Sequence, residues 1–198
     1  ETATDGRGEV TKFTYGLYGN PRTENIGNYP PVTYFYNSIG WLNSLTDQVE
    51  STTGFVYDKR GLLISKTDPL GKTTNFTYTI AGKLLTKNDR NNQTTSYTYT
   101  FTGKLHTIIY PDTTTEFSYN QHDDLIGMED SIGNTTYTHD AVHRLTSSTN
   151  PYGFTVSYGY DENGNLTELT YPGDKKVIYT YTELNQLETV KIDWLDQT

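Results

Sequence analysis

Hydrophobic and polar residues alternate along this chain in short runs that are separated by turn residues. In TNFTYTIAGKLLTKND, residues 74–89, Phe76 and Tyr78 flank a threonine, and a glycine and two leucines follow. TSYTYTFTGKLHTIIY, residues 95–110, repeats nearly the same order. Side chains two apart on a strand share a face, so Phe76 and Tyr78 are predicted on one face and Thr77 on the other. The pattern predicts a strand, a short turn and a second strand.

The same pattern recurs nine times, with 20 or 21 residues between equivalent positions. A fixed internal period of this kind indicates a tandem-repeat architecture. We call the aromatic position before the turn of each repeat the anchor. The nine anchors are Tyr15, Tyr36, Tyr57, Tyr78, Tyr99, Tyr119, His139, Tyr160 and Tyr181. Two residues before every anchor stands another aromatic residue, so each first strand is predicted to have one aromatic face and one mostly Thr/Ser face.

The residues after the anchor predict the turn. Glycine stands four residues past the anchor in six of nine repeats, and Asp123, His143 and Asn185 fill the other three positions. We expect a positive φ there, which glycine and most of these residues tolerate. Six residues past the anchor stands Pro21 in the first repeat and a leucine in the others: Leu42, Leu63, Leu84, Leu105, Leu125, Leu145, Leu166 and Leu187. A second turn is visible in DPLG, residues 68–71, and in NPYG, residues 150–153.

Each repeat is therefore predicted to be one β-hairpin. About nine hairpins of 20–21 residues predict an all-β fold, in which roughly 18 short strands form a long, twisted and curled antiparallel sheet. A single hairpin cannot bury its aromatic face alone, so we expect the aromatic side chains of neighbouring repeats to bury one another. No linker or second domain is visible, which predicts a single repeat domain over residues 1–198.

Composition and charge narrow the function classes. The net charge is −9 and no basic patch stands out, so nucleic-acid binding is not expected. The chain has no cysteine, so neither a disulfide framework nor a thiolate metal site is possible. No run approaches the roughly 18 apolar residues of a membrane span. The first residues, 1–9, lack the apolar segment of a signal peptide.

The stretch YDKRGLLISKTDPLGKTTNFTY, residues 57–78, contains a Tyr-Asp pair, a glycine followed closely by leucine, and Asp-Pro-x-Gly. This order resembles the Rhs or YD repeat, and the resemblance extends over essentially the whole chain. YDENGNLTELTYPGD, residues 160–174, is similar, and HDAVHRLTSSTNPYG, residues 139–153, is a variant. Aspartate follows the anchor only at Asp58, Asp140 and Asp161, and we interpret Thr, Asn or Gly elsewhere as turn variations.

The resemblance implies a function. In that family, long YD-repeat tracts form a β-sheet that spirals into a hollow shell around a toxic C-terminal domain, in bacterial polymorphic toxins and insecticidal toxin complexes. Related shells stand on animal cells in teneurins. The resemblance therefore implies a secreted or cell-surface, non-enzymatic wall segment without a cofactor. Its implied partners are an enclosed toxin or effector domain of the same polypeptide and further repeats. Such shells use more than nine repeats and this chain begins and ends within the pattern, so we expect a segment of a longer protein.

Three groups of residues suggest other chemistry. His139 and His143 flank Asp140 at a spacing that would suit a metal on a helix, but here the spacing spans a hairpin turn, and we favour a diverged repeat. The pairs Asp123-Asp124 and Glu129-Asp130 are adjacent on the chain and would point to opposite faces of a strand, which does not suit glycoside hydrolysis. Ser147 and Ser148 lack a nucleophile elbow. We predict no catalytic residue and no metal ligand.

Two further expectations concern surfaces. Trp41 and Trp194 could stack on sugar rings, which keeps a cell-surface carbohydrate-binding or adhesion module as the alternative function. A meander that ends abruptly leaves two unpaired edge strands, near residues 10–15 and 184–192. Because open edges recruit other strands, we predict self-association through these edges.

Overall fold

The structure is a computed structural model that describes residues 1–16 and 18–194. These residues contain nineteen β-strands and no helix, and hence no helix able to cross a membrane. The strands are β1 (Thr2–Thr4), β2 (Val10–Tyr15), β3 (Pro21–Ile26), β4 (Val32–Tyr36), β5 (Leu42–Thr46), β6 (Thr52–Tyr57), β7 (Leu63–Thr67), β8 (Thr73–Tyr78), β9 (Leu84–Asn88), β10 (Thr94–Tyr99), β11 (Leu105–Ile109), β12 (Thr114–Tyr119), β13 (Leu125–Asp130), β14 (Gly133–His139), β15 (Leu145–Thr149), β16 (Thr155–Tyr160), β17 (Leu166–Tyr171), β18 (Lys175–Tyr181) and β19 (Leu187–Ile192).

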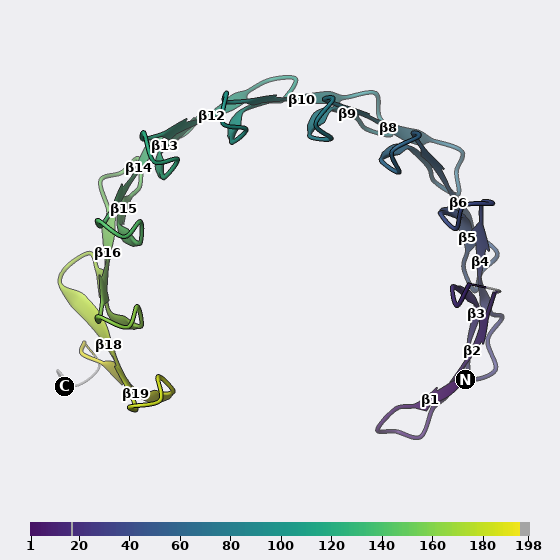
Figure 1. Ribbon diagram of the computed structural model, residues 1–198, viewed down its shortest axis with the longest axis horizontal. Helices are drawn as coiled ribbons and strands as arrows, with labels where there is room; N and C mark the ends of the chain where they lie inside the picture. Colours follow the sequence, from purple (N-terminus) through teal and green to yellow (C-terminus); the bar gives the residue numbers. More distant parts are fainter. Residues whose placement is uncertain (17, 195–198) are drawn as a thin grey trace. The chain divides into compact units, whose positions relative to one another are not determined.

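The strands fall into two compact units, Glu1–Ser96 and Tyr97–Thr198. Within each unit, the strands contact only the strands that precede and follow them in the sequence, so each unit is a meander one layer thick (Figure 1). The pairing is antiparallel throughout. The predicted all-β fold of tandem hairpins is confirmed. A single repeat domain over residues 1–198 stays a prediction.

The repeat pattern coincides with the strand boundaries. Every anchor is the last residue of an even-numbered strand, from Tyr15 in β2 to Tyr181 in β18. Every repeat leucine is the first residue of an odd-numbered strand, from Leu42 in β5 to Leu187 in β19, and Pro21 begins β3. The anchor therefore closes the first strand of each hairpin and the leucine opens the second.

A β-bulge lies beside the anchor. Tyr57 is paired with Leu63 and the preceding Val56 with Ser65, so Ile64 has no partner across the strand. The same register shift occurs beside the anchor at the other hairpins whose register is described, for example at Tyr78 and Tyr160. Each bulge adds local twist, and no hydrophobic period reveals it.

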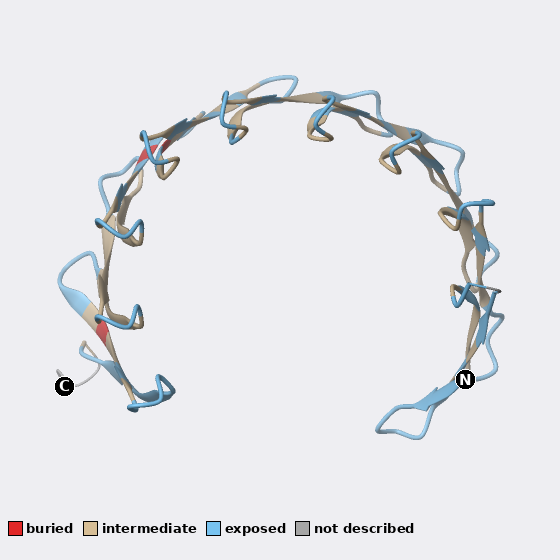
Figure 2. Cartoon of the chain, viewed as in Figure 1, coloured by how far each residue is buried: buried red, intermediate tan, exposed pale blue. Residues whose placement is uncertain are grey.

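The sheet has no deeply buried core among the described residues. Most strand residues are half-buried, and only Val177 and Thr135, each 9% exposed, are classed as buried (Figure 2). Both lie four residues before an anchor, on the aromatic face of their strands. Ring contacts of the described residues lie within a repeat, as between Phe13 and Tyr15 with centroids 6.4 Å apart, or involve a turn residue, as between Tyr57 and Trp41 with centroids 5.5 Å apart. Anchors stand on alternate strands, roughly 9.4–9.8 Å apart, which is too far for direct ring contact.

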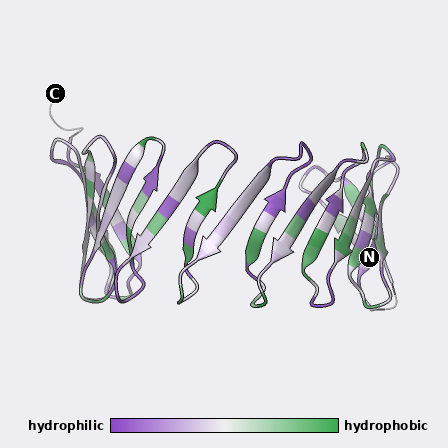
Figure 3. Cartoon of the chain, turned by 90° about the horizontal axis from the view of Figure 1, so that it is seen from above, coloured by the Kyte–Doolittle hydropathy of each residue, from purple (hydrophilic) through white to green (hydrophobic). Residues whose placement is uncertain are grey.

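The opposite face of the sheet carries paired hydroxyl groups. Thr77 Oγ1 lies 2.6 Å from Thr86 Oγ1, and Thr98 Oγ1 lies 2.7 Å from Thr107 Oγ1. Similar pairs join β2 to β3 and β18 to β19. Along the strands, hydrophobic and hydrophilic residues are interspersed (Figure 3). The predicted division into an aromatic face and a Thr/Ser face is confirmed.

One expectation about the edges is wrong. Residues 10–15 were expected to be an open edge, but β2 pairs with β1 through Thr2–Lys12 and with β3 through Phe13–Glu24. The short strand Thr2–Thr4 folds back and supplies backbone partners to β2. At the other end, β19 pairs with β18, and no further strand pairs with it in the described part of the chain.

Candidate functional site

The turn after most anchors is built around one side-chain oxygen atom. The backbone N–H groups of Arg60 and Leu62 donate to Asp58 Oδ1 at 2.8 and 3.0 Å. The N–H of Gly61 donates to the carbonyl oxygen of Asp58 at 3.1 Å, and Gly61 has a φ of 86°. The aspartate and the glycine of the repeat are thus both parts of one Asx turn.

Other repeats keep this geometry with other residues. Asn37, Asn120 and Asp140 each accept two backbone N–H groups through a side-chain oxygen. Thr79 and Thr100 accept one such bond through the hydroxyl. The interpretation of Asn and Thr as turn variations is supported, because each presents a side-chain acceptor oxygen. Gly16 has no such oxygen, and its turn keeps the backbone bond from the Gly19 N–H to the Gly16 carbonyl oxygen at 3.1 Å.

The turns at the opposite ends of the strands use the same arrangement. Asp68 Oδ1 accepts the N–H groups of Leu70 and Lys72 at 2.9 and 3.0 Å. Asp47, Asp89 and Asn150 do the same in their turns. Many of the acidic residues of this chain are therefore turn-forming groups.

The turn carboxylates are held in their charged form. The N–H of Arg144 lowers the pKa of Asp140 below its usual value of 3.8, and the Arg144 guanidinium adds to this effect. The N–H groups of Gln93 and Asn91 lower the pKa of Asp89 in the same way. Donors that favour the charged form lower a carboxyl pKa.

The predicted positive φ angles are confirmed. Asp123, His143 and Asn185 have φ values of 65°, 68° and 57°, at the position that glycine occupies in the other repeats. Non-glycine residues rarely adopt this conformation, so the backbone geometry is kept where the preferred residue is absent.

The anchor tyrosine joins one repeat to the repeat before it. The hydroxyl of Tyr78 donates to the carbonyl oxygen of Leu63 at 2.7 Å. Equivalent bonds run from Tyr119 to Leu105 at 2.8 Å, from Tyr160 to Leu145 at 3.0 Å and from Tyr181 to Leu166 at 2.9 Å. We call this contact the tyrosine strap. Burial raises the pKa of Tyr78 and of Tyr119 above the usual value of 10.0, so both hydroxyls keep their protons at neutral pH.

Neighbouring turns also contact each other through side chains. Arg60 donates to the carbonyl oxygens of Thr79 and Ile80 at 2.9 and 3.0 Å. Arg144 donates to the carbonyl oxygen of Asp161 at 3.0 Å, and its guanidinium carbon lies 4.7 Å from the centre of the Tyr160 ring. These contacts link residues 17 to 20 positions apart and stabilise the rim of the sheet.

The histidines singled out in the sequence do come together. His143 Nδ1 lies 2.9 Å from Asp124 Oδ2, and the rings of His143 and His122 have centroids 5.2 Å apart. His139 lines the same cavity of about 520 Å³. The His143 hydrogen bond, followed by one from Asn120, lowers the pKa of Asp124. Among the described residues, no group of histidines and carboxylates has the arrangement that would hold a metal ion.

The other candidate groups take part in the sheet or its turns. Asp123 accepts from Thr102, whereas Asp124 accepts from His143. Glu129 lies opposite Glu116, whereas Asp130 accepts the N–H groups of a turn. Neither carboxylate pair therefore faces a common ligand.

The two serines are also strand residues. Ser147 Oγ lies 2.6 Å from Thr138 Oγ1, within the row of paired hydroxyl groups. Ser148 is paired across the strands with Tyr137 and Val156. No described contact joins either serine to His143.

Both tryptophans pack against their own chain. The Trp41 ring lies 5.5 Å from the Tyr57 ring, and a Cβ added to Gly61 would lie 3.0 Å from Trp41 Cζ2. The Trp194 ring meets Tyr171 edge-on at 5.8 Å. Both residues are half-buried, so part of each ring is packed against its own chain and is not exposed to a ligand.

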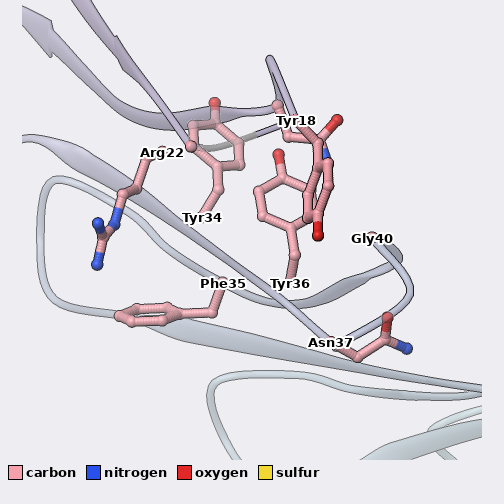
Figure 4. A pocket seen from close by; sticks show the side chains of 9 residues that line it. Tyr18, Arg22, Tyr34, Phe35, Tyr36, Asn37 and Gly40 are labelled. Atoms are coloured by element: carbon pink, nitrogen blue, oxygen red, sulfur yellow. The ribbon is translucent and has the colours of Figure 1, made fainter.

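An aromatic cavity lies between the first two repeats (Figure 4). Its volume is about 300 Å³, and Tyr18, Tyr34, Tyr36 and Arg22 contribute to its lining. The Tyr34 hydroxyl donates to Glu24 at 3.0 Å, whereas Tyr18 is 85% exposed. The cavity occurs in the repeat where proline replaces the leucine.

Comparison with known families identifies the repeat. The profile of the RHS Repeat family matches residues 57–87, 119–156 and 160–195, more than half of the chain. The chain belongs to the RHS repeat family. No curated protein matches the chain.

Solved structures share the RHS fold of this chain. The Photorhabdus luminescens Tc holotoxin pore with a substituted TccC3 aligns with a TM-score of 0.74 at 18% identity, over 96% of this chain and 12% of that chain. TcdB2–TccC3 aligns with a TM-score of 0.73 at 18% identity, over 92% of this chain and 12% of that chain. TcdB2–TccC3 without its hypervariable C-terminal region aligns with a TM-score of 0.72 at 17% identity, over 93% of this chain and 12% of that chain. This RHS chain thus spans about one eighth of each structure.

The tyrosine strap is the feature of this RHS repeat that sequence reasoning missed. The anchor column was visible, but a tyrosine on a half-buried face is explained by packing alone. The one available signal was the preference for Tyr over Phe, because eight of the nine anchors are tyrosine and none is phenylalanine. A hydroxyl that is kept at an aromatic position indicates a hydrogen-bond acceptor nearby.

Proposed function

We propose that this chain is a non-enzymatic wall segment of a secreted or cell-surface RHS shell, which encloses a C-terminal toxin or effector domain of the same polypeptide. The observation that carries the proposal is the fold match to TcdB2–TccC3 over 92% of the chain, together with family membership. One matching structure is described as lacking a hypervariable C-terminal region, which agrees with a wall that carries a variable domain.

The contacts within the chain suit a mechanical role. Backbone pairing runs from strand to strand, bulged hairpins repeat at a fixed spacing, and tyrosine straps tie one repeat to the next. Such a sheet can be extended by further repeats at either edge without a change of design. The partners proposed are therefore further repeats of the parent protein and the enclosed domain.

The experiment is made on the full-length gene product. We expect the reading frame around this segment to encode more repeats and a variable C-terminal domain. In the purified full-length protein, that domain should resist a protease that digests it readily when it is expressed alone. A stop codon close to this segment, or a C-terminal domain digested equally fast in both forms, would overturn the proposal.

The alternative is a carbohydrate-binding or adhesion module, and one observation favours it. The cavity of Figure 4 combines aromatic rings with an arginine and the side chains of Asn20 and Asn37, a mixture that suits sugar rings and their hydroxyls. The packed rings of Trp41 and Trp194 favour it less. Glycan binding by the isolated chain that is lost in Tyr18→Ala and kept in Tyr152→Ala, a similarly exposed tyrosine elsewhere, would support this alternative.

A further inference from the structure

Equivalent cavities lie between neighbouring hairpins at several places in the described part of the chain. Each is lined by an anchor, by the aromatic residue two positions before it, and by the residue seven positions past the preceding anchor. In the first cavity these residues are Tyr36, Tyr34 and Arg22. At the position of Arg22, two later cavities have His106 or Ile126. The first cavity therefore differs from its equivalents because it carries a permanent positive charge.

A β-bulge places Arg22 beside this cavity. Strands β2 and β3 shift register between Thr14 and Tyr15, so Arg22 has no partner across the strands. Bulges re-aim a side chain in this way and are over-represented next to active sites. The geometry of the first hairpin thus directs a cation to the junction with the second.

Among the described residues, Arg22 is the arginine without a carboxylate partner. The chain has 24 acidic residues, and the other four arginines each form an ion pair with an aspartate: Arg7, Arg60, Arg90 and Arg144. The guanidinium of Arg22 has no ion pair or hydrogen bond with any residue that the structure describes. Glu24, on the same strand, accepts from the Tyr34 hydroxyl at 3.0 Å. Because no described carboxylate lines the cavity, the guanidinium is available to an anion from outside the chain.

Other polar groups of the cavity are also available. The hydroxyl of Tyr36 makes no strap to Pro21, which stands where the other repeats have leucine, and it has no other hydrogen-bond partner among the described residues. Burial raises the pKa of Tyr36 above the usual value of 10.0, so this hydroxyl keeps its proton at neutral pH. The side-chain oxygen of Asn37 is held by its own turn, which leaves the amide nitrogen as a donor. The cavity therefore offers a guanidinium, a hydroxyl and an amide to one ligand.

Tyrosine rings complete the cavity. In the view of Figure 4, the rings of Tyr18 and Tyr36 lie on one side of Tyr34, and Arg22 lies on its other side. The apolar face of a sugar ring packs on such rings, and its hydroxyls bond to amides and hydroxyls. The carboxylate of a uronic acid forms two parallel bonds with a guanidinium. The volume of about 300 Å³ lies at the lower end of the range for small-molecule sites, which suits one unit of a longer saccharide.

We propose that this cavity binds an acidic saccharide, with the carboxylate of a uronic acid unit on Arg22 and its sugar ring against the tyrosines. The inference rests on the carbohydrate-binding alternative proposed above, for which it names the class of ligand. The net charge of −9 disfavours contact between an acidic saccharide and the rest of the chain, so the recognition is confined to this cavity.

The test uses trisaccharides of galacturonic, glucuronic and mannuronic acid, each beside its methyl ester, which keeps the sugar rings and removes the charge. Binding to the purified 198-residue chain is measured by isothermal titration calorimetry at low and at high ionic strength. We expect at least one acid to bind about fivefold or more tightly than its ester, because a charge-assisted contact in a partly exposed site favours the acid. This ratio should shrink at high ionic strength, because salt screens the contact.

Two arginine variants are matched in their change of charge. Arg22→Gln removes the positive charge from the cavity, so the ratio of acid to ester affinity should fall to about one while binding of the ester is kept. Arg7→Gln removes a positive charge from the same unit outside the cavity and should keep the ratio. Tyr18→Ala removes a ring and should weaken the binding of acid and ester alike.

The outcomes separate this inference from the function on which it rests. Equal affinity for acid and ester in the parent chain, or the same ratio in Arg22→Gln as in Arg7→Gln, would overturn the acidic ligand and leave carbohydrate binding in place. An absence of binding to every acid and every ester would overturn both.

Discussion

At the residue scale, the anchor tyrosine connects packing with hydrogen bonding. Its ring lies on the aromatic face, and its hydroxyl reaches the carbonyl oxygen of a leucine in the preceding repeat. That leucine lies beside a β-bulge, where the regular ladder is interrupted. The strap therefore supplies a donor at the point where strand pairing is disturbed, and a phenylalanine ring could not do so.

The strap makes a testable contribution to stability. Tyr78→Phe removes a hydroxyl that donates to Leu63 at 2.7 Å and should lower the free energy of unfolding by about 1 kcal/mol, as urea denaturation would measure. The matched control is Tyr57→Phe, because the Tyr57 hydroxyl has no hydrogen-bond partner among the described residues. Equal losses in the two variants would contradict a specific role for the strap.

The turn glycines provide a second prediction at this scale. Gly164 has a φ of 89° and free space around it, so Gly164→Ala should cost about 1 kcal/mol through backbone strain alone. Gly61 has a φ of 86°, and a Cβ there would lie 3.0 Å from Trp41. Gly61→Ala should therefore destabilise the chain more than Gly164→Ala in the same urea titration. A smaller loss for Gly61→Ala would show that Trp41 moves away freely.

At the scale of the element, the Asx turn explains why the repeat tolerates variation. The turn needs one acceptor oxygen and one residue with positive φ, and several residue types supply each. Asp, Asn and Thr serve as the acceptor, for example at Asp58, Asn37 and Thr79. The hairpin is therefore conserved in geometry although its dipeptide changes along the chain.

The charged turns predict how stability depends on pH. Backbone donors hold the pKa values of Asp89 and Asp140 below 3.8, so these carboxylates contribute stability that is fully present above about pH 4 and is lost as the pH falls through their lowered pKa values. When urea unfolding is measured between pH 6 and pH 2.5, the midpoint concentration of urea should decrease at the acid end of this range. Asp89→Asn keeps an acceptor oxygen and removes the charge, so its midpoint should fall less. A parallel decline in Asp89→Asn would assign the acid loss to other groups.

The strand boundaries and turns of each hairpin could be predicted from the sequence, because they depend on residues close together in the chain. Strand ends and turns depend on residues within about six positions of the anchor, so the anchors and the leucines mark the boundaries of the strands. The strap and the histidine cluster join residues 15 and 19 positions apart. Such contacts depend on the bulge and on the register of neighbouring hairpins, which the hydrophobic pattern leaves open. The degree of burial was overestimated because each unit is a sheet only one layer thick, in which most strand residues are half-buried.

At the scale of the whole molecule, the chain is a set of nearly equal units with unequal junctions. Tyrosine straps close some junctions, arginines bridge neighbouring turns at others, and the junction at His139 has titratable groups instead. Stability in a repeat array is a sum over units and the interfaces between them. The weakest interface then determines where the array opens first, whereas the number of units determines how far it extends.

The free edge of β19 gives a prediction for the isolated chain. This strand is exposed along its length, and it pairs on one side with β18. Because an unpaired edge offers backbone donors and acceptors to another strand, the 198-residue chain should associate reversibly as its concentration rises, which sedimentation equilibrium would detect.

Val190→Lys places a charge on this edge and should weaken the association. The matched control is Val56→Lys in β6, because Val56 and Val190 are 53% and 52% exposed but β6 is paired on both sides. A chain that stays monomeric at millimolar concentration, or two variants that weaken association equally, would show that the edge of β19 is not the contact.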